Sequence, residues 1–330
     1  MTRSLLAYTE PVGSASRCAF AFAVVLTASV VARVAPAGVD APVLDRRTLF
    51  ADLEALADPA LQGRQTGSAG GIAARAHIAA AFEAIGLRPA GTSGYLQPFS
   101  FSVRRSGAIV GPGPFRRTYH DAANIVGRLE GTDPAKRPIV VSAHYDHLGV
   151  VDGVVYPGAD DNASGVAGLL AVARAMKSRT HRHPLVFVAF DAEELNLRGA
   201  KAFVRDGGNQ RVALNVNLDM ISRNAGHEIY VAGTSHTPSL RPPLESLQSR
   251  TAATIRFGHD TPDLGAGDWT MLSDHGAFHE AGVPFVYFGV EDHEDYHRPT
   301  DTLDRVDRRF FADVTALVIE AVVALDRELH

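Results

Sequence analysis

Short apolar runs alternate along this chain with longer stretches in which apolar residues recur at helical spacing. The short runs are rich in valine, isoleucine and phenylalanine, which is typical of strands buried on both faces of a sheet. They occupy residues 138–143, 185–190, 212–218 and 284–289. The longer stretches predict helices over 163–177, 198–206, 239–250, 273–281 and 307–328.

The region before these elements contains two further helix signals and one strand signal. Residues 44–57 repeat leucine and phenylalanine at helical spacing, and residues 95–103 alternate like a strand. Ser68 can cap a helix that runs to Ile85, because a serine hydroxyl accepts from the free amides of a helix start. Gly86 would end that helix, since glycine readily adopts the left-handed conformation that follows a helix end.

This order of elements predicts the α/β class, a three-layer sandwich with a mixed, mostly parallel central sheet flanked by helices. One or two edge strands of that sheet can be antiparallel. The chain has 330 residues, of which 46% are hydrophobic, so it can bury one large core. Its net charge is −5, and basic residues form no stripe, so we predict no nucleic-acid partner.

The beginning of the chain predicts an export signal. Arg3 and Arg17 precede an apolar run over residues 18–32, and residues 35–37 read Ala-Pro-Ala, a small-x-small cleavage site. We therefore predict a signal peptide over 1–37, with cleavage after residue 32 as an alternative. An uncleaved anchor is the rival interpretation, but the apolar run is short for a membrane span.

The remaining chain, residues 38–330, is predicted to be one exported domain, either periplasmic or secreted. It contains no cysteine, because Cys18 is the only one in the sequence. A cysteine nucleophile and a thiolate zinc site are thereby excluded from this domain. No stable membrane association is expected, and the sequence does not determine an oligomeric state.

Side chains that can bind metal gather just past the ends of the predicted strands. They are His144, Asp146 and His147, then Asp191, Glu193 and Glu194, then Asp219, then His293 and His297, with Asp160 and Asp161 as a fifth group before a helix. Sites in open α/β sheets form outside the carboxyl ends of strands, so these groups can meet in one crevice. A lone residue of this kind is usually a cap or a solvated loop residue, an explanation that must here account for five groups.

The chemistry of this set points to metal. Imidazole and carboxylate ligands without thiolate suit zinc, with manganese or cobalt as substitutes. Two such ions about 3.5 Å apart can activate a water molecule and polarise a scissile carbonyl. The residues therefore predict a hydrolase with two zinc ions.

Ordered motifs also carry a resemblance to a known family. AHYDHLG, GADDNASG, an adjacent glutamate pair, NLDM, SDHGAF and YHRPTDT follow one another, after an upstream LQGRQTGSAGG. The set resembles the zinc peptidase family that includes bacterial leucyl aminopeptidases, glutamate carboxypeptidase II and glutaminyl cyclases. The likeness covers roughly residues 45–325. It implies a zinc-dependent aminopeptidase with a bridging water, acting on peptides with a free N-terminus.

The resemblance implies a role for each matching position. The ligands of two zinc ions would be His144, Asp160, Glu194, Asp219 and His297, with Asp160 bridging both metals. Glu193 would be the general base, and Asp146 would orient the imidazole of His144. The peptide bond between Asp160 and Asp161 resembles one that the family keeps cis.

Two further motifs offer rival interpretations of the site. Residues 293–297 match the HExxH zinc-peptidase pattern, but Gly289 and Pro299 leave no room for the helix that this pattern needs. Residues 273–275 read Ser-Asp-His, yet adjacent residues cannot form a catalytic triad with one another. We interpret Ser273 instead as a helix cap. The histidines at positions 147, 181, 183 and 259 are interpreted as surface residues.

Other functions remain open on the same residues. A carboxypeptidase would need a cationic clamp for a C-terminal carboxylate, for which Arg223 and Arg298 are candidates. A glutaminyl cyclase would need one zinc ion and no attacking water. A non-catalytic binding module without metal is the third alternative.

Overall fold

The computed structural model describes residues 44–104, 116–207 and 212–329. The predicted signal peptide over 1–37 lies outside these residues. Over the described ranges, no helix has both the length and the apolar character that crossing a membrane requires.

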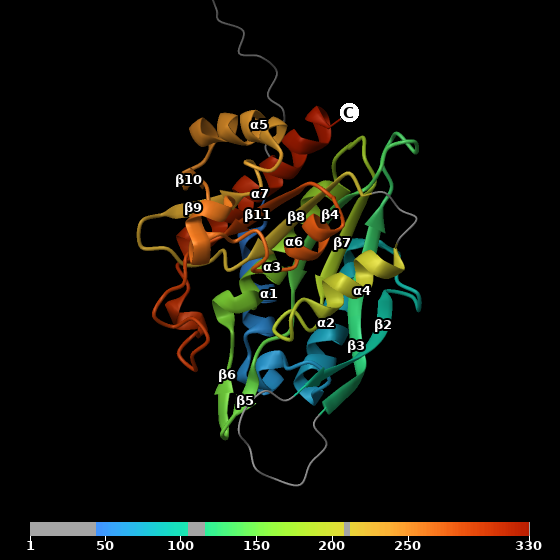
Figure 1. The fold of residues 1–330 in the computed structure, drawn as a ribbon, viewed down its shortest axis with the longest axis vertical. Coiled ribbons are helices and arrows are strands. Elements are labelled where there is room, and N and C mark those ends of the chain that lie inside the picture. Colours follow the sequence, from blue (N-terminus) through green and yellow to red (C-terminus); the bar gives the residue numbers. More distant parts are fainter. Residues whose placement is uncertain (1–43, 105–115, 208–211, 330) are drawn as a thin grey trace, which may run out of the picture. The chain divides into compact units, whose positions relative to one another are not determined.

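Within the described residues, nine strands form one sheet in the order β1-β3-β7-β4-β8-β11-β9-β10, with β2 also paired to β3 (Figure 1). The strands are β1 (Arg88–Pro89), β2 (Leu96–Arg104), β3 (Arg116–Leu129), β4 (Ile139–His144), β7 (Leu185–Phe190), β8 (Leu214–Asp219), β9 (Glu228–Ala232), β10 (Thr254–Phe257) and β11 (Phe285–Gly289). A separate hairpin consists of β5 (Gly149–Val151) and β6 (Val154–Tyr156).

The centre of the sheet is parallel and its flanks are not. Strands β7, β4, β8 and β11 pair in parallel. Strand β3 is antiparallel to β7, and β9 is antiparallel to β11. The predicted mixed α/β sheet is confirmed, with antiparallel pairing extending further over its flanks than one or two edge strands.

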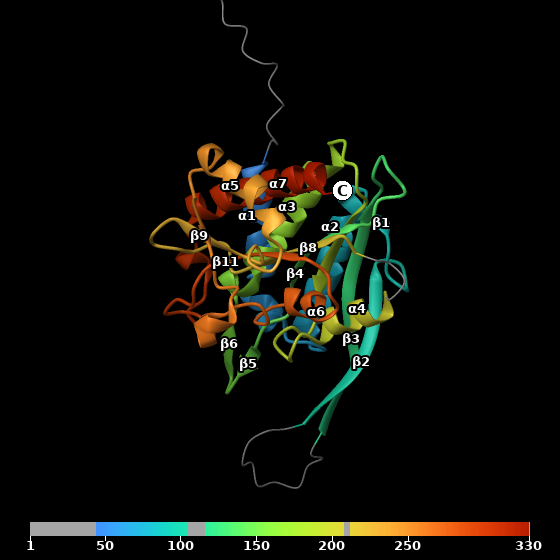
Figure 2. The ribbon, with the colours of Figure 1, turned by 45° about the horizontal axis from the view of Figure 1, so that its top comes forward.

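Helices cover both faces of the sheet (Figure 2). They are α1 (Arg46–Leu56), α2 (Ala69–Ile85), α3 (Gly165–Lys177), α4 (Arg198–Asp206), α5 (Arg241–Glu245), α6 (His275–Glu280) and α7 (Arg308–Glu328). Buried residues of α1, α2, α3 and α7 share one large apolar cluster, whereas Ala200 of α4 and Ala277 and Phe278 of α6 belong to another. The sheet therefore separates two cores, as a three-layer sandwich requires.

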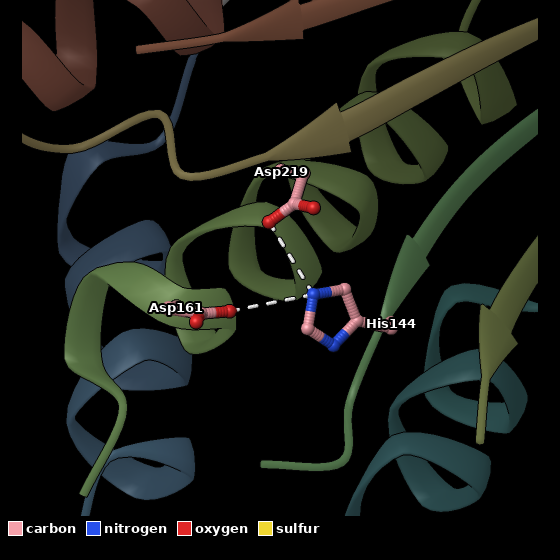
Figure 3. A group of neighbouring side chains, drawn as sticks. All are labelled: His144, Asp161 and Asp219. Carbon is pink, nitrogen blue, oxygen red and sulfur yellow. Dashed lines mark hydrogen bonds and ion pairs between the residues drawn. The ribbon is translucent and has the colours of Figure 1, made fainter. Parts of the chain in front are cut away.

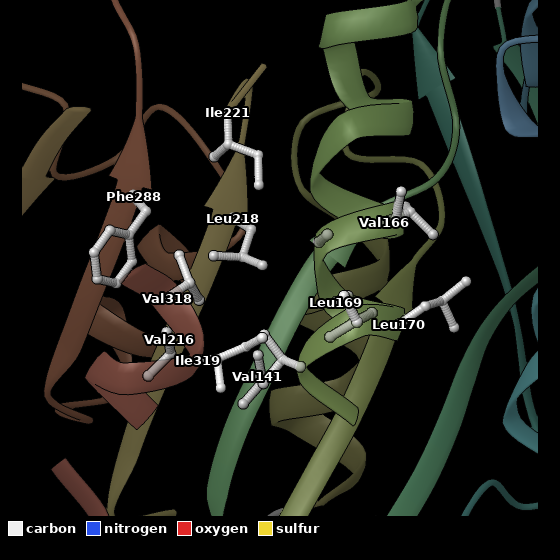
Figure 4. Close-up of a cluster of buried hydrophobic side chains, with 14 of the residues drawn as sticks. Val141, Val166, Leu169, Leu170, Val216, Leu218, Ile221, Phe288, Val318 and Ile319 are labelled. Atoms are coloured by element: carbon white, nitrogen blue, oxygen red, sulfur yellow. The ribbon is translucent and has the colours of Figure 1, made fainter. Parts of the chain in front are cut away.

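The central strands divide their side chains between these two cores. Val141 and Phe187 pack in the larger cluster, while Val140 and Val188 pack in the smaller one. Successive strand residues point to opposite faces, so a strand covered on both sides needs an unbroken apolar run. Figure 4 shows the larger cluster, where residues of α3 and α7 meet β4, β8 and β11.

Most predicted elements are confirmed with small shifts at their ends. The hydroxyl of Ser68 accepts the amide of Gly71 at 3.0 Å, and Gly86 follows the helix with a φ of 79°. The predicted helix over 239–250 is wrong as one element, because α5 has only five residues between two short 3-10 turns. Strands β3, β9 and β10 were missed, since their sequences mix apolar residues with charged residues or histidine.

Candidate metal centre

Three side chains from separate segments meet beyond the ends of β4 and β8. His144 is the last residue of β4, Asp219 is the last of β8, and Asp161 lies in the turn over Ala159–Ser164 that leads into α3. The Nε2 atom of His144 lies 3.3 Å from Oδ1 of Asp219 and 3.4 Å from Oδ1 of Asp161 (Figure 3). All three are buried. Their ligand atoms are close enough to surround one metal ion.

A second group lies on the other side of the same aspartate. Nδ1 of His147 lies 2.9 Å from Oε1 of Glu194 and 3.6 Å from Oδ2 of Asp161. Nε2 of His297 lies 3.1 Å from Oδ2 of Asp161 and 3.3 Å from Oε2 of Glu194. Asp161 thus presents one carboxylate oxygen to each group, which is the arrangement of a ligand shared by two metals.

The predicted bridging role of Asp160 is therefore wrong for this geometry. One oxygen of Asp160 accepts the backbone amide and the hydroxyl of Ser222, each at 2.8 Å. Its other oxygen lies 3.0 Å from Nε2 of His293. Neighbouring residues of a turn project in different directions. Only Asp161 therefore faces His144, His147 and His297.

The predicted cis peptide is also displaced by one position. The cis bond joins Asp161 to Asn162, and not Asp160 to Asp161. The turn before it is held by Asp301, whose carboxylate accepts the amides of Asp160 at 2.9 Å and of Asp161 at 3.0 Å. Asp301 therefore fixes the backbone from which the shared carboxylate projects.

The nearest group that orients the His144 ring is a carbonyl, while Oδ1 of the Asp146 carboxylate, the predicted orienting group, lies 3.8 Å from the same ring nitrogen. Nδ1 of His144 lies 3.0 Å from the backbone oxygen of Asp146, and a carbonyl only accepts, so Nδ1 carries the proton. Nε2 then faces the carboxylates of Asp161 and Asp219, and its lone pair would be available to a metal ion held between the three side chains. The Asp146 carboxylate accepts the backbone amide of Glu193 at 3.0 Å instead, and so positions the predicted base.

The surroundings of Glu193 and Glu194 shift the pKa values of their carboxyls in opposite directions. Burial raises the pKa of its carboxyl well above the usual range, and Asp274 and Asp219 add to the rise against the opposing effect of His144. By contrast, hydrogen bonds from His147 and His297 outweigh burial and lower the pKa of Glu194. The carboxyl groups of two adjacent glutamates thus differ in the direction of their pKa shifts, because their surroundings differ.

A network of buried hydrogen bonds joins the segments that carry the candidate ligands. The carboxylate of Asp191 accepts the hydroxyls of Thr66 and Tyr145, each at 2.8 Å, and the amide of Ala123 at 3.0 Å. Thr66 also lies 3.3 Å from the Asp146 carboxylate. Asp191, which the sequence placed among the candidate ligands, is therefore a structural residue that ties the strand ends together.

The interpretation of four histidines as surface residues is wrong for three of them. His147 is 1% exposed and faces Glu194. His181 and His183 are buried in a turn near the C-terminal helix, where the amide of His183 donates to Asp326 at 2.7 Å. His259 stacks on Trp269 with ring centroids 3.8 Å apart. The spacing of His147 from His144, three residues past a strand end, was the available signal for its burial.

The HExxH pattern at 293–297 is not helical, as the flanking glycine and proline predicted. The Ser-Asp-His segment differs from its prediction, because the hydroxyl of Ser273 accepts the side-chain amide of Asn217 at 2.9 Å and caps no helix.

Asp274 is fully buried, and neither of its carboxylate oxygens has a hydrogen-bond partner among the described residues. Burial raises the pKa of Asp274 to about 7, although His144 opposes the rise.

His275 predicts an acid sensitivity of the fold. Burial lowers the pKa of His275 to about 4 from its ordinary 6.5. At a pH between these two values, this histidine is protonated in the unfolded chain but neutral in the folded chain. The free energy of unfolding therefore falls as the pH drops. The loss should reach about 3 kcal/mol by pH 4.

Denaturant unfolding of the metal-free protein at pH 6.5 and pH 4.5 measures this loss. A His275→Gln variant can keep a donor to the carbonyl of Trp269, which Nε2 of His275 contacts at 2.8 Å. Its stability should vary less over this interval than that of the wild type. If the free energy of unfolding changed equally with pH in the two proteins, His275 would not be the group that causes the acid sensitivity.

The donor set fits zinc. Buried and partly buried imidazoles and carboxylates surround the two positions, and thiolates are absent from the described residues of the site. Carboxylates crowd the histidines so closely that hydrogen bonds to Asp161 and Glu194 overcome burial and raise the pKa of His297 to about 10. Such a concentration of buried negative charge calls for cations between the side chains.

Comparison with known sequences assigns more than half of the chain, including the candidate metal centre, to one family. Residues 124–322 match peptidase family M28. Aminopeptidase YwaD of Bacillus subtilis is 34% identical over 222 residues, which cover 62% of this chain and 46% of YwaD. The BOS complex subunit NCLN of Homo sapiens is 29% identical over 223 residues, covering 61% of this chain and 39% of that one. The aligned region thus spans less than half of either relative.

A solved structure confirms the fold over a larger share of the chain. The aminopeptidase from Aneurinibacillus sp. strain AM-1 superposes with a TM-score of 0.68. The match covers 84% of this chain and 93% of that one, at 17% sequence identity. At this identity the likeness concerns the fold alone.

Proposed function

Because this chain belongs to peptidase family M28, we propose that it is a metal-dependent aminopeptidase that uses a pair of zinc ions to remove N-terminal residues from peptides. The observation that carries the proposal is the position of Asp161 between two ligand groups. His144 and Asp219 would hold one ion, and Glu194 and His297 the other. His147 is a further candidate at the second position.

Zinc bound at these positions would polarise the scissile carbonyl and lower the pKa of a water molecule between the ions. The chain itself supplies the proton transfer. Glu193 lies beside the ligand Glu194, and its raised pKa suits a group that accepts a proton from the attacking water and passes it to the leaving amine. The Asp146 carboxylate holds the Glu193 backbone in place for this transfer.

The charge of the site favours a substrate with a free amino terminus. Glu193 and Asp274 are acidic groups beyond the proposed ligand set, and an α-ammonium group bound beside them would stabilise their ionised forms. The carboxypeptidase alternative needs a free cation. Arg223, one of the two candidate clamps, is already paired with Asp295 and Glu294, whereas Arg298 stays a candidate. The ion pairs of Arg223 favour the aminopeptidase over a carboxypeptidase that would use this arginine.

We further propose that the protein acts after export, in the periplasm or outside the cell. The apolar run over 18–32 and the cleavage site after it support this proposal. N-terminal sequencing of the protein recovered from its host tests it, since a mature chain that begins at residue 38 is expected.

A panel of aminoacyl-anilide substrates tests the activity. We expect the purified protein to cleave unblocked substrates, to lose at least about 100-fold of its rate with a chelator, and to recover with added zinc. N-acetylated substrates serve as the matched control, and they should remain uncleaved. Cleavage of the acetylated substrates, or an unchanged rate with chelator, would contradict the proposal.

A further inference from the structure

Arg64 is far from the candidate ligands in sequence, but it is buried against the loops that carry them. Arg64 is 1% exposed, and its guanidinium donates only to backbone carbonyls. Nε reaches the oxygen of Tyr145 at 2.9 Å, and Nη2 reaches the oxygen of Gly158 at 2.9 Å. Nη1 reaches the oxygens of Leu56 at 2.8 Å and Pro157 at 2.5 Å.

Apart from that of Leu56 at the end of α1, these carbonyls belong to the two loops that carry the candidate ligands. Tyr145 directly follows the ligand His144, and it lies two residues before His147. Gly158 lies three residues before the shared ligand Asp161, whose own carbonyl is 3.5 Å from Nη2. One side chain thus joins the backbone of the histidine loop to the backbone of the aspartate loop.

The charge of Arg64 is matched to the site above it. Burial lowers the pKa of Arg64 to about 10, and Asp161, Asp301 and Asp146 oppose this decrease. The group therefore keeps its positive charge at neutral pH without forming a direct ion pair. It balances part of the negative charge of the carboxylates while leaving their oxygens free for metal.

The local backbone is shaped to deliver this side chain. Arg64 has a φ of 52° and Gly63 a φ of 65°. A Cβ atom on Gly63 would lie 2.2 Å from the oxygen of Tyr156, so only glycine allows the segment to approach the hairpin β5–β6 so closely. A non-glycine residue in the left-handed region is strained, and it persists where its surroundings over-determine it.

We propose that Arg64 is a positioning residue that sets the spacing of the two ligand loops and thereby the affinity of the metal pair. This inference rests on the proposed metal binding. A planar guanidinium has five donors in a fixed fork, whereas lysine has three donors on one atom and cannot span the same carbonyls. Geometry as well as charge is therefore needed at this position.

The test compares Arg64→Met and Arg64→Lys with the wild-type full-length protein and with Arg174→Met. Arg174 forms a partly buried ion pair with Asp52, between α3 and α1, so its loss lowers stability without touching the ligand loops. Two measurements are made on each protein. Hydrogen exchange is followed without metal over 145–147 and 158–162, and cobalt is titrated with its visible spectrum as the readout.

We expect Arg64→Met to raise exchange in both loops at least tenfold, to weaken cobalt binding at least tenfold and to alter the cobalt spectrum. Arg64→Lys should give the same changes to a smaller degree, and Arg174→Met should give none of them. Wild-type exchange and wild-type cobalt titration in Arg64→Met would overturn the inference. If Arg64→Met does not fold, Arg64→Lys decides by the same criteria.

The two measurements separate this inference from the proposed function. A wild-type protein that binds no cobalt would contradict the metal site, whatever Arg64 does. The exchange comparison would then still decide whether Arg64 holds the loops together, because it is made on metal-free protein. Unchanged exchange in both Arg64 variants would refute that role by itself.

Discussion

Replacing Glu193 by glutamine is expected to lower kcat on the order of 100- to 10,000-fold while leaving metal binding intact. Glutamine keeps the size of the side chain and the backbone bond to Asp146, but it cannot accept a proton. The ligand Glu194 next to it remains unchanged. Turnover of an aminoacyl-anilide and metal content by mass spectrometry measure the two halves of this expectation.

A glutamate outside the site provides the matched control. Glu280 is exposed at the end of α6, so Glu280→Gln removes the same charge without changing the proton transfer. Its kcat should equal that of the wild type. A Glu193→Gln enzyme that retains wild-type kcat would show that another group accepts the proton, and one that has lost its metal would identify Glu193 as a ligand.

Replacing Asp161 by alanine is expected to remove both metals and all measurable activity. Its two carboxylate oxygens lie within 3.4 Å of the Nε2 atoms of His144 and His297, so each position loses a ligand at once. Calorimetric titration with zinc measures the loss, and we expect binding to weaken at least about 1,000-fold.

The neighbouring aspartate distinguishes a shared ligand from a structural carboxylate. Asp160→Ala removes the acceptor for Ser222 and for His293, so it should destabilise the fold by about 1–3 kcal/mol. It should still bind zinc more tightly than Asp161→Ala does. The opposite order of affinities would restore Asp160 to the bridging position that the resemblance implied.

Local pattern was enough to predict the class of the fold. Strand β4 is apolar at every position before His144 except Ser142, and both cores receive its side chains, so its sequence alone indicates a strand buried on two faces. The caps at Ser68 and Gly86 are likewise properties of a few neighbouring residues. Strand β3 was missed because it alternates with charged residues and gains its order from pairing with β2 and β7.

The chemistry of the site could be predicted in kind, but its assignment to individual residues could not. Residue types and their positions after strand ends indicate a centre of imidazole and carboxylate. Which of two adjacent aspartates faces the histidines depends on Ser222 and Asp301, which are remote in sequence. The burial of His147 depends in the same way on Glu194.

The sequence by itself determined most helices, the buried central strands and the imidazole and carboxylate chemistry of the candidate site, because periodicity and side-chain chemistry are local properties. Only the tertiary structure decided that Asp161 lies between the two groups, that a carbonyl orients His144, and that Arg64 joins the ligand loops. These are directions of side chains, and each is set by contacts between segments that no local pattern encodes.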